Sequence, residues 1–306
     1  MDEIVNQSQF VDQYQFSDPR TRYPSISPPV QQQAEPGLQG DMDPVPDLGE
    51  ATYRGSGRLQ GRKALITGGD SGIGGAVAIA FAREGADVAI SYLPDEESDA
   101  RRIVEWIEAA GRTAVAFPGD LKDSAYCRAL VDAAVDGLGG LDIVVSNAGK
   151  QVFVERIEDL TDEQFADTVH TNVFGMFWVI KAAVPHLRPG STIIVTASLE
   201  AYKQLPFLLD YATTKGAINT FSKALAQQLA PRGIRVNAVA PGPTWTALQV
   251  THEFPPDKLP RYGKDSPIGR AAQPAELAPA YVFLASAESS FVIGETLNVN
   301  GGEPTP

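Results

Sequence analysis

Residues 64–74 have the sequence ALITGGDSGIG, in which a short apolar run leads into a glycine-rich turn, and an amphipathic segment follows. This order predicts a strand, a tight turn and a helix. In such a unit Gly68 permits the turn, Gly72 lets the backbone approach a pyrophosphate, and Gly74 allows the helix to pack closely on the sheet. The amide groups at the start of the helix then face an anion. A glycine loop in this context predicts a dinucleotide site.

From Arg62 onward, short apolar runs alternate with longer amphipathic segments, which is typical of repeated βα units and a parallel sheet. The pattern predicts one Rossmann-type, doubly wound α/β domain over residues 56–306, with seven parallel strands and helices on both faces. The predicted strands are 63–67, 87–92, 113–117, 141–146, 191–197, 234–240 and 295–299, and the predicted helices are 73–85, 96–110, 123–138, 161–187, 210–230 and 273–286.

Residues 1–55 differ from the rest of the chain because they are rich in Gln, Pro and acidic residues and have little periodicity. A segment of this composition cannot fold alone. Two alternatives remain: a disordered tail, or an extended arm laid over the body or over a neighbouring subunit. The second is motivated by apolar residues that a solvated tail does not need, namely Phe10, Tyr14, Phe16, Tyr23 and Ile26.

Composition narrows the class of protein. The 306 residues are 43% hydrophobic, which is enough for a large core, and the net charge of -13 without a basic stripe argues against nucleic acid. The single cysteine, Cys127, excludes an internal disulfide. No secretory leader and no membrane-length apolar run is apparent, so we expect a cytoplasmic protein with a small-molecule substrate. The three histidines lack metal-ligand spacing, and no metal site is predicted.

Three polar residues point to proton and hydride transfer. Ser198 follows the apolar run 193–197, so its hydroxyl should emerge at the carboxyl end of a strand, where open α/β sheets bind ligands. Tyr211 and Lys215 are four residues apart on a predicted helix and therefore share a face. A cation fixed beside a phenol lowers the phenol's pKa from its usual value near 10, as acid/base work near neutral pH requires.

Further motifs follow one another along the chain: TGxxxGxG at 67–74, NAG at 147–149, Asn172, Ser198, YxxxK at 211–215 and PG at 241–242. In this order and spacing they resemble the short-chain dehydrogenase/reductase family, over residues 58–302. More narrowly, GGDSGIG at 68–74, DYATTK at 210–215, PGPTWT at 241–246 and the Pro-rich leader resemble the bacterial glucose/ribitol-dehydrogenase-like subgroup. The resemblance implies a strand order of 3-2-1-4-5-6-7 and a homotetramer built from homodimers. The predicted helices 161–187 and 210–230 are long enough to pair across a two-fold axis.

The resemblance also implies roles for four residues. Tyr211 is the general acid/base, and Lys215 lowers its pKa and holds the nicotinamide ribose. Ser198 polarises the substrate oxygen by hydrogen bonding. Asn172 binds a water that connects Lys215 to solvent. The family usually has two Asn before Ala-Gly, whereas this chain has Ser146 at the first of these positions.

The predicted cofactor is NAD or NADP. Ser91-Tyr92-Leu93 ends the second predicted strand without the Asp or Glu usual for NAD. Nearby, however, Asp70 and residues 95–97 supply negative charge, and no Lys or Arg lies between Leu93 and Arg101. A 2′-phosphate would be repelled, so NAD is slightly favoured. The expected cofactor contacts are Gly68, Asp70, Ser71, Gly72, Ile73, Gly74, Tyr92, Leu93, Asp120, Leu121, Asn147, Ala148, Gly149, Tyr211, Lys215, Pro241, Gly242, Thr244 and Thr246.

The expected substrate contacts are Gln151, Ser198, Glu200, Tyr202 and Trp245, together with a mobile lid over 245–267; Glu200 and Tyr202 could instead face solvent. We expect hydride transfer between NAD(P) and the CH-OH or C=O group of a small alcohol, sugar, polyol or carbonyl compound. The alternative is a catalytically silent dinucleotide-binding sensor or structural protein on the same fold. An epimerase or dehydratase is a further possibility.

Overall fold

The computed structural model describes residues 12–251 and 254–305, so Phe10 of the predicted arm and His252, one of the three histidines, fall outside it. Each predicted strand is present, with bounds shifted by at most two residues. The strands are β1 Lys63–Thr67, β2 Asp87–Tyr92, β3 Ala114–Pro118, β4 Ile143–Ser146, β5 Thr192–Thr196, β6 Arg235–Pro241 and β7 Thr296–Val299. The helices are α1 Gly72–Arg83, α2 Glu97–Ala109, α3 Ser124–Leu138, α4 Asp162–Val169, α5 Met176–Ala183, α6 Leu209–Leu229 and α7 Pro274–Ala285.

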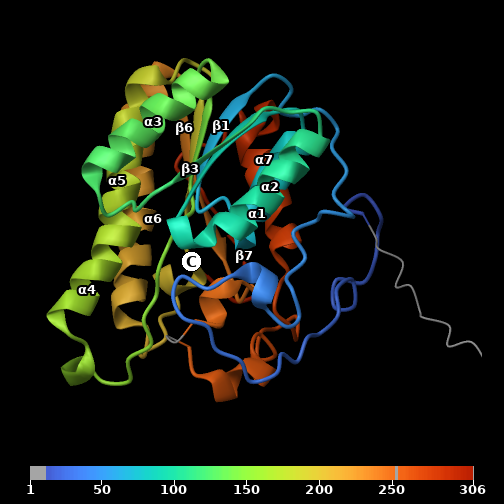
Figure 1. Ribbon diagram of the computed structural model, residues 1–306, viewed down its shortest axis with the longest axis vertical. Helices are drawn as coiled ribbons and strands as arrows, with labels where there is room; N and C mark the ends of the chain where they lie inside the picture. Colours follow the sequence, from blue (N-terminus) through green and yellow to red (C-terminus); the bar gives the residue numbers. More distant parts are fainter. Residues whose placement is uncertain (1–11, 252–253, 306) are drawn as a thin grey trace, which may run out of the picture.

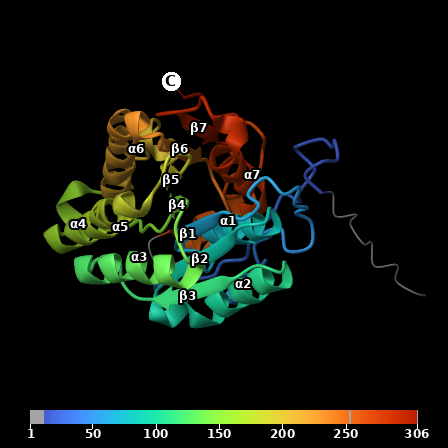
Figure 2. The same ribbon diagram turned by 90° about the horizontal axis from the view of Figure 1, so that it is seen from above.

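The strands form one parallel sheet in the order β3-β2-β1-β4-β5-β6-β7, which confirms the predicted doubly wound fold. Helices α1, α2 and α7 cover one face, and α3, α4–α5 and α6 cover the other (Figure 2). Successive strand side chains alternate between the two faces. Ile66 of β1 therefore joins the core under α1, α2 and α7, whereas its neighbour Leu65 joins the core under the other helices.

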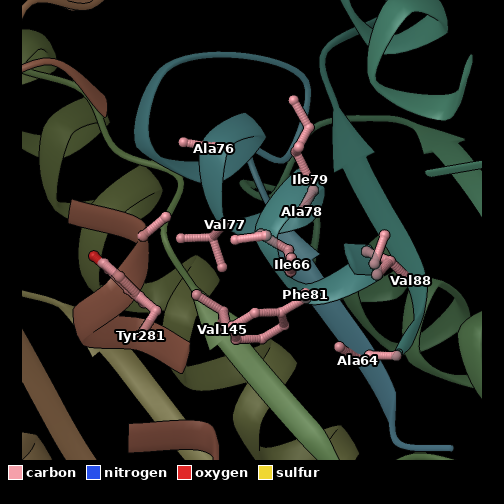
Figure 3. Close-up of a cluster of buried hydrophobic side chains, with 14 of the residues drawn as sticks. Ala64, Ile66, Ala76, Val77, Ala78, Ile79, Phe81, Val88, Val145 and Tyr281 are labelled. Carbon is pink, nitrogen blue, oxygen red and sulfur yellow. The ribbon is translucent and has the colours of Figure 1, made fainter. Parts of the chain in front are cut away.

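The first of these cores is built around α1. Figure 3 shows Val77 and Phe81 of α1 packed together with Ile66 of β1, Val145 of β4 and Tyr281 of α7. All five side chains are at most 1% exposed. This packing fixes the start of α1, and with it the glycine loop, relative to the ends of the strands.

The predicted single helix over 161–187 is interrupted in the structure. Thr161 and Gln164 form a capping box at the start of α4, but between α4 and α5 the chain makes a π-helical segment, η4 His170–Gly175, and a 3₁₀ turn follows at Val184–His186. Single π turns inside helices occur mostly at functional sites. The interruption carries Asn172, one of the predicted catalytic residues.

The described part of the N-terminal arm lies against the body. Figure 1 shows it in blue, passing the same end of the molecule as the orange segment that follows β6. Met42 packs with Trp245, Val250 and Leu259 in a third apolar cluster, and Leu48 enters the core around α1. Because these contacts bury apolar side chains of the arm, the arm takes part in the packed structure.

The apolar residues that motivated the arm hypothesis behave differently from one another. Tyr14 and Phe16 are exposed. Tyr23, in contrast, lies below the guanidinium of Arg270, at 5.7 Å from carbon to ring centroid, and Ile26 packs on the third cluster. In the described residues, no helix combines the length and apolar composition that a bilayer-spanning segment requires.

Candidate active site

A cleft of about 1070 Å³ lies at the carboxyl ends of the strands, where open α/β sheets bind their ligands. Most of the residues predicted from the sequence line it. They are Gly68, Asp70, Ser71, Gly72, Ile73, Tyr92, Leu93, Asp120, Leu121, Asn147, Ala148, Gly149, Gln151, Ser198, Glu200, Tyr211, Lys215, Pro241, Gly242, Thr244 and Thr246. The predicted residues Gly74, Asn172, Tyr202 and Trp245 are not among its lining residues.

Two glycines determine the shape of the glycine loop, one through its backbone conformation and one through a close approach. Gly68 has a φ of +60°, in the left-handed region that favours glycine. A Cβ on Gly74 would overlap the carbonyl oxygen of Gly68, so this glycine lets the start of α1 lie directly against the turn. Gly74 therefore acts through packing, as the sequence predicts, and it is not among the residues that line the cleft.

Trp245 and Tyr202, two of the predicted substrate contacts, also lie outside the lining of the cleft. Trp245 is fully buried in the third apolar cluster, and its Nε1 donates to the carbonyl oxygen of Pro44 at 2.7 Å. Tyr202 packs against the core under α3, α5 and α6, and its hydroxyl donates to Oδ1 of Asn219 at 3.3 Å. Both rings pack against protein, and neither is among the residues that line the cleft.

Ser198, Tyr211 and Lys215 meet inside the cleft. The Lys215 Nζ lies 5.2 Å from the centroid of the Tyr211 ring, as their spacing on α6 predicts, and donates to the carbonyl oxygen of Thr196 at 2.8 Å. The Ser198 Oγ accepts the Glu200 N–H at 3.1 Å, and Ser198 lies near enough to the Tyr211 phenol to favour the phenolate. The end of β5 and the first turns of α6 thus supply all three groups.

The pKa shifts differ from the expected ones. Burial raises the pKa of Tyr211 to about 12, the nearby Ser198 side chain opposes this rise, and the negative charge of Glu200 adds to it. Burial also lowers the pKa of Lys215 to about 8. The expectation that Lys215 depresses the Tyr211 pKa is therefore wrong for this arrangement, because the ammonium lies over the ring and the cost of burying a phenolate dominates.

Asn172 holds the backbone beside the catalytic lysine. Its Oδ1 accepts the Lys150 N–H at 2.7 Å, and its Nδ2 donates to the Lys150 carbonyl oxygen at 2.7 Å and to the Thr214 hydroxyl at 3.0 Å. The side chain is 1% exposed. A Cβ on Gly149 would lie 3.5 Å from Oδ1 of Asn172 and 3.6 Å from the Lys215 Nζ. The π-helical segment thus presents an amide that fixes residues 149–150 next to Lys215.

Two threonines complete the frame: Thr67, which begins the TGxxxGxG motif, and Thr196, which belongs to none of the predicted motifs. Thr67, at the end of β1, accepts the backbone N–H groups of Asn147 and Ala148 at 3.0 and 3.2 Å. Thr196, at the end of β5, donates its hydroxyl to Oδ1 of Asn147 at 3.1 Å, while Nδ2 of Asn147 donates to the Gly68 carbonyl oxygen. The signal was present in the sequence, because each threonine ends an apolar strand.

The wall of the cleft near β2 is acidic. Asp70 is 2% exposed, and its Oδ2 has no hydrogen-bond partner within the described part of the chain. Burial raises the pKa of Asp70 to about 6, and burial together with repulsion by Asp70 raises the pKa of Glu96 to about 8. A buried oxygen without a donor is costly unless a ligand supplies one. The glycine loop and this oxygen fit the pyrophosphate and a ribose hydroxyl of a dinucleotide.

The family model described as enoyl-(acyl carrier protein) reductase matches residues 68–303. Among curated relatives, the uncharacterized oxidoreductase YghA of Escherichia coli is 57% identical over 94% of this chain and 98% of its own length. A protein named glucose and ribitol dehydrogenase from Daucus carota is 42% identical over 90% of this chain and 96% of its own length.

Solved structures of short-chain dehydrogenases are also similar. The protein from Burkholderia cenocepacia in complex with NADP has a TM-score of 0.73 and 36% identity, and the protein from Mycobacterium paratuberculosis bound to NAD has a TM-score of 0.74 and 32% identity. Each comparison covers 80% of this chain and 98% of the other. Within the residues that the structure describes, no group of three or more His, Cys, Asp or Glu could hold a metal ion.

Proposed function

The chain belongs to the short-chain dehydrogenase/reductase family, as an oxidoreductase that uses NAD(P), and we propose that it interconverts a polyol or sugar hydroxyl and the corresponding carbonyl compound. The observation that carries this proposal is that Ser198, Tyr211 and Lys215 line the same cleft, with the Lys215 Nζ over the phenol ring. A protein that only binds a dinucleotide has no need for this arrangement.

The chain's own residues supply the proton chemistry. When the cofactor is bound, its nicotinamide ring accepts or donates the hydride. In the reducing direction, the Tyr211 phenol donates its proton to the substrate oxygen, which the Ser198 hydroxyl holds in place. Because the pKa of Tyr211 is raised to about 12, the phenol carries this proton at neutral pH. In the oxidising direction Tyr211 must lose its proton first, so alcohol oxidation should become faster as the pH rises.

The polar wall beside Ser198 suits a substrate with several hydroxyl groups. Glu200 is 8% exposed, and its Oε2 accepts the Leu205 N–H at 2.7 Å. Its second carboxylate oxygen can accept a hydrogen bond from a substrate hydroxyl, and the Gln151 amide, which also lines the cleft, can do the same. A buried carboxylate repels anionic substrates. We therefore propose neutral polyols and sugars, a class that includes the compounds in the carrot relative's name.

We also propose that NAD is preferred to NADP. Asp70, Asp95 and Glu96 line the cleft near the end of β2. A ribose hydroxyl can donate to Oδ2 of Asp70, whereas a 2′-phosphate would add negative charge beside these carboxyl groups.

The test is a panel of polyols, aldoses and small aldehydes offered with NAD or NADP, followed by the absorbance of the reduced nicotinamide. We expect turnover with polyols or sugars, a higher kcat/KM with NAD, and faster oxidation at alkaline pH. NADH binding without turnover across the panel would contradict the enzymatic proposal and favour the catalytically silent alternative. Release of no free reduced cofactor, with isomerised sugar as product, would instead indicate an epimerase.

Exposed aromatic side chains on the α4–α5 face support the predicted homo-oligomer. Phe165, Phe174 and Phe177 are 37–41% exposed, and Phe174 stacks between His170 and Trp178. Exposed apolar groups that adjoin one another mark interaction surfaces. We propose that this face pairs with a second copy of the chain across a two-fold axis. Sedimentation velocity should show an oligomer for the natural chain and smaller species for Phe174→Glu; a monomeric natural chain would contradict the proposal.

A further inference from the structure

One side chain of the N-terminal arm reaches the glycine loop. Gln39 begins a short 3₁₀ turn, η1 Gln39–Asp41, and its Oε1 accepts the backbone N–H of Gly72 at 2.8 Å. Gln39 is 7% exposed, so this hydrogen bond is shielded from water. A residue outside the βα repeat thus contacts the loop where the fold places a dinucleotide.

The Gly72 amide needs such a partner. Gly72 is the first residue of α1, and the first backbone N–H groups of a helix have no hydrogen-bond acceptor within that helix. Ser71 stands at the N-cap position but makes no capping hydrogen bond with its side chain. Gly72 also has a φ of +49°, so the peptide that joins it to Ser71 departs from regular helical geometry. The Gln39 oxygen fixes the orientation of this peptide.

Gln39 is itself held from a second side. Its backbone N–H donates to Oδ2 of Asp99 at 2.6 Å, and the N–H of Gly40 donates to Oδ1 at 3.2 Å. Asp99 belongs to α2 and is 3% exposed. The carboxylate therefore anchors the turn of the arm to the helix beside the glycine loop.

The arm also reaches the opposite wall of the cleft. The Gln33 N–H donates to the Val250 carbonyl oxygen at 2.6 Å, and Glu35 forms an ion pair with Lys150 at 2.8 Å. Glu35 and Pro36 line the cleft. Between Gln33 and Gln39, the arm therefore spans from the segment after β6 to the start of α1.

We propose that Gln39 is a positioning residue of the dinucleotide site: its hydrogen bond to the Gly72 amide lets the N-terminal arm hold the glycine loop in the conformation that binds the pyrophosphate. The inference rests on the use of NAD(P) and is independent of which alcohol is the substrate. It gives the arm a role in cofactor binding in addition to its role in packing.

The main variant is Gln39→Met in the full chain, because methionine has similar length but no strong acceptor. Gln31→Met is the matched control, since the Gln31 side chain bonds within the arm, accepting the Asp43 N–H at 3.0 Å. We expect the Kd for NADH, measured by fluorescence titration, to rise about tenfold in Gln39→Met while kcat at saturating cofactor changes less than about twofold. Without cofactor, amides 68–76 should exchange hydrogen faster. Gln31→Met should match the natural chain.

Gln39→Glu provides a second test if Gln39→Met does not fold. This variant keeps an acceptor for the Gly72 amide, so slow amide exchange should be retained. Its negative charge should weaken NADH binding at low ionic strength and let it recover in salt. An NADH Kd that is equal in Gln39→Met and Gln31→Met, or a Gln39→Glu protein without the salt-reversible loss, would overturn the proposal. A natural chain that binds no NADH would instead overturn the cofactor assignment.

Discussion

Helix α6 and the N-terminal arm reach the same cleft by different means. α6, Leu209–Leu229, is one uninterrupted helix, and its spacing alone brings Lys215 over the Tyr211 ring. The arm has little regular structure and contacts the cleft region through separate side-chain bonds, such as Gln39 to Gly72 and Trp245 to Pro44. The groups that react lie on the rigid element, and the arm supports the loops around them.

This difference has a physical reason. Proton transfer depends on the relative placement of a few atoms, and residues on helices and strands are held more accurately than residues on loops. Loop conformations, in contrast, can be stabilised by single hydrogen bonds worth about 1 kcal/mol each. Substitutions on α6 should therefore affect the chemical step by large factors, and substitutions at the arm should affect binding or stability by small ones.

Tyr211→Phe should cause the largest change. It removes the proton donor but keeps the ring below Lys215, so kcat should fall about 10²- to 10⁴-fold while the NADH Kd stays within about twofold. The measurement is steady-state turnover beside fluorescence titration. Tyr262→Phe is the matched control, because Tyr262 also lines the cleft and donates its hydroxyl to the Thr244 carbonyl oxygen. Equal losses of kcat in the two variants would contradict the role of Tyr211 as the proton donor.

Lys215→Met should lower turnover less than Tyr211→Phe does, because it removes the predicted contact with the nicotinamide ribose, yet it should stabilise the fold at neutral pH. Burial lowers the lysine pKa from 10.5 to about 8. Between these values the unfolded chain binds more protons than the folded one, so this group makes stability rise with pH from about 8 to 10.5, and its full penalty is present below about 8. After subtraction of the lost bond to Thr196, the variant should gain roughly 2 kcal/mol at neutral pH.

Urea unfolding of the natural chain and of Lys215→Met, near neutral pH and again near pH 10.5, checks this prediction. The gain should shrink as the pH rises, because the natural lysine then loses its penalty. A variant that is less stable than the natural chain at both pH values would show that the Thr196 hydrogen bond outweighs the cost of burying the ammonium.

The fold and the catalytic set follow from local patterns in the sequence. Alternating βα segments predicted the seven strands, the family resemblance implied their order, and the residues that line the cleft mostly follow strand ends. The interruption at Asn172 was not predicted, because the π turn is associated with contacts to Lys150 and Thr214, which are distant in the sequence. Helical periodicity carries no information about such contacts.

The errors in the site have a related cause. The sequence placed Lys215 beside Tyr211 correctly, but the sign of the Tyr211 pKa shift depends on burial, which a spacing pattern does not show. Gln39 was not identified because a Pro/Gln-rich segment has no periodicity from which its contacts could be inferred. Trp245 follows a cofactor-loop motif and was assigned to the substrate, although the arm covers it.

Trp245→Phe should give the smallest effect and separates the two roles considered for this residue. Phenylalanine retains an aromatic ring in the third apolar cluster but cannot donate to the Pro44 carbonyl oxygen, so the free energy of unfolding should fall by about 1 kcal/mol. The KM for the alcohol should not change, because the side chain is fully buried. Trp106→Phe on α2, where the tryptophan is 39% exposed, is the control and should cost less than about 0.5 kcal/mol. A raised KM with unchanged stability would return Trp245 to the substrate site and weaken the distinction between α6 and the arm.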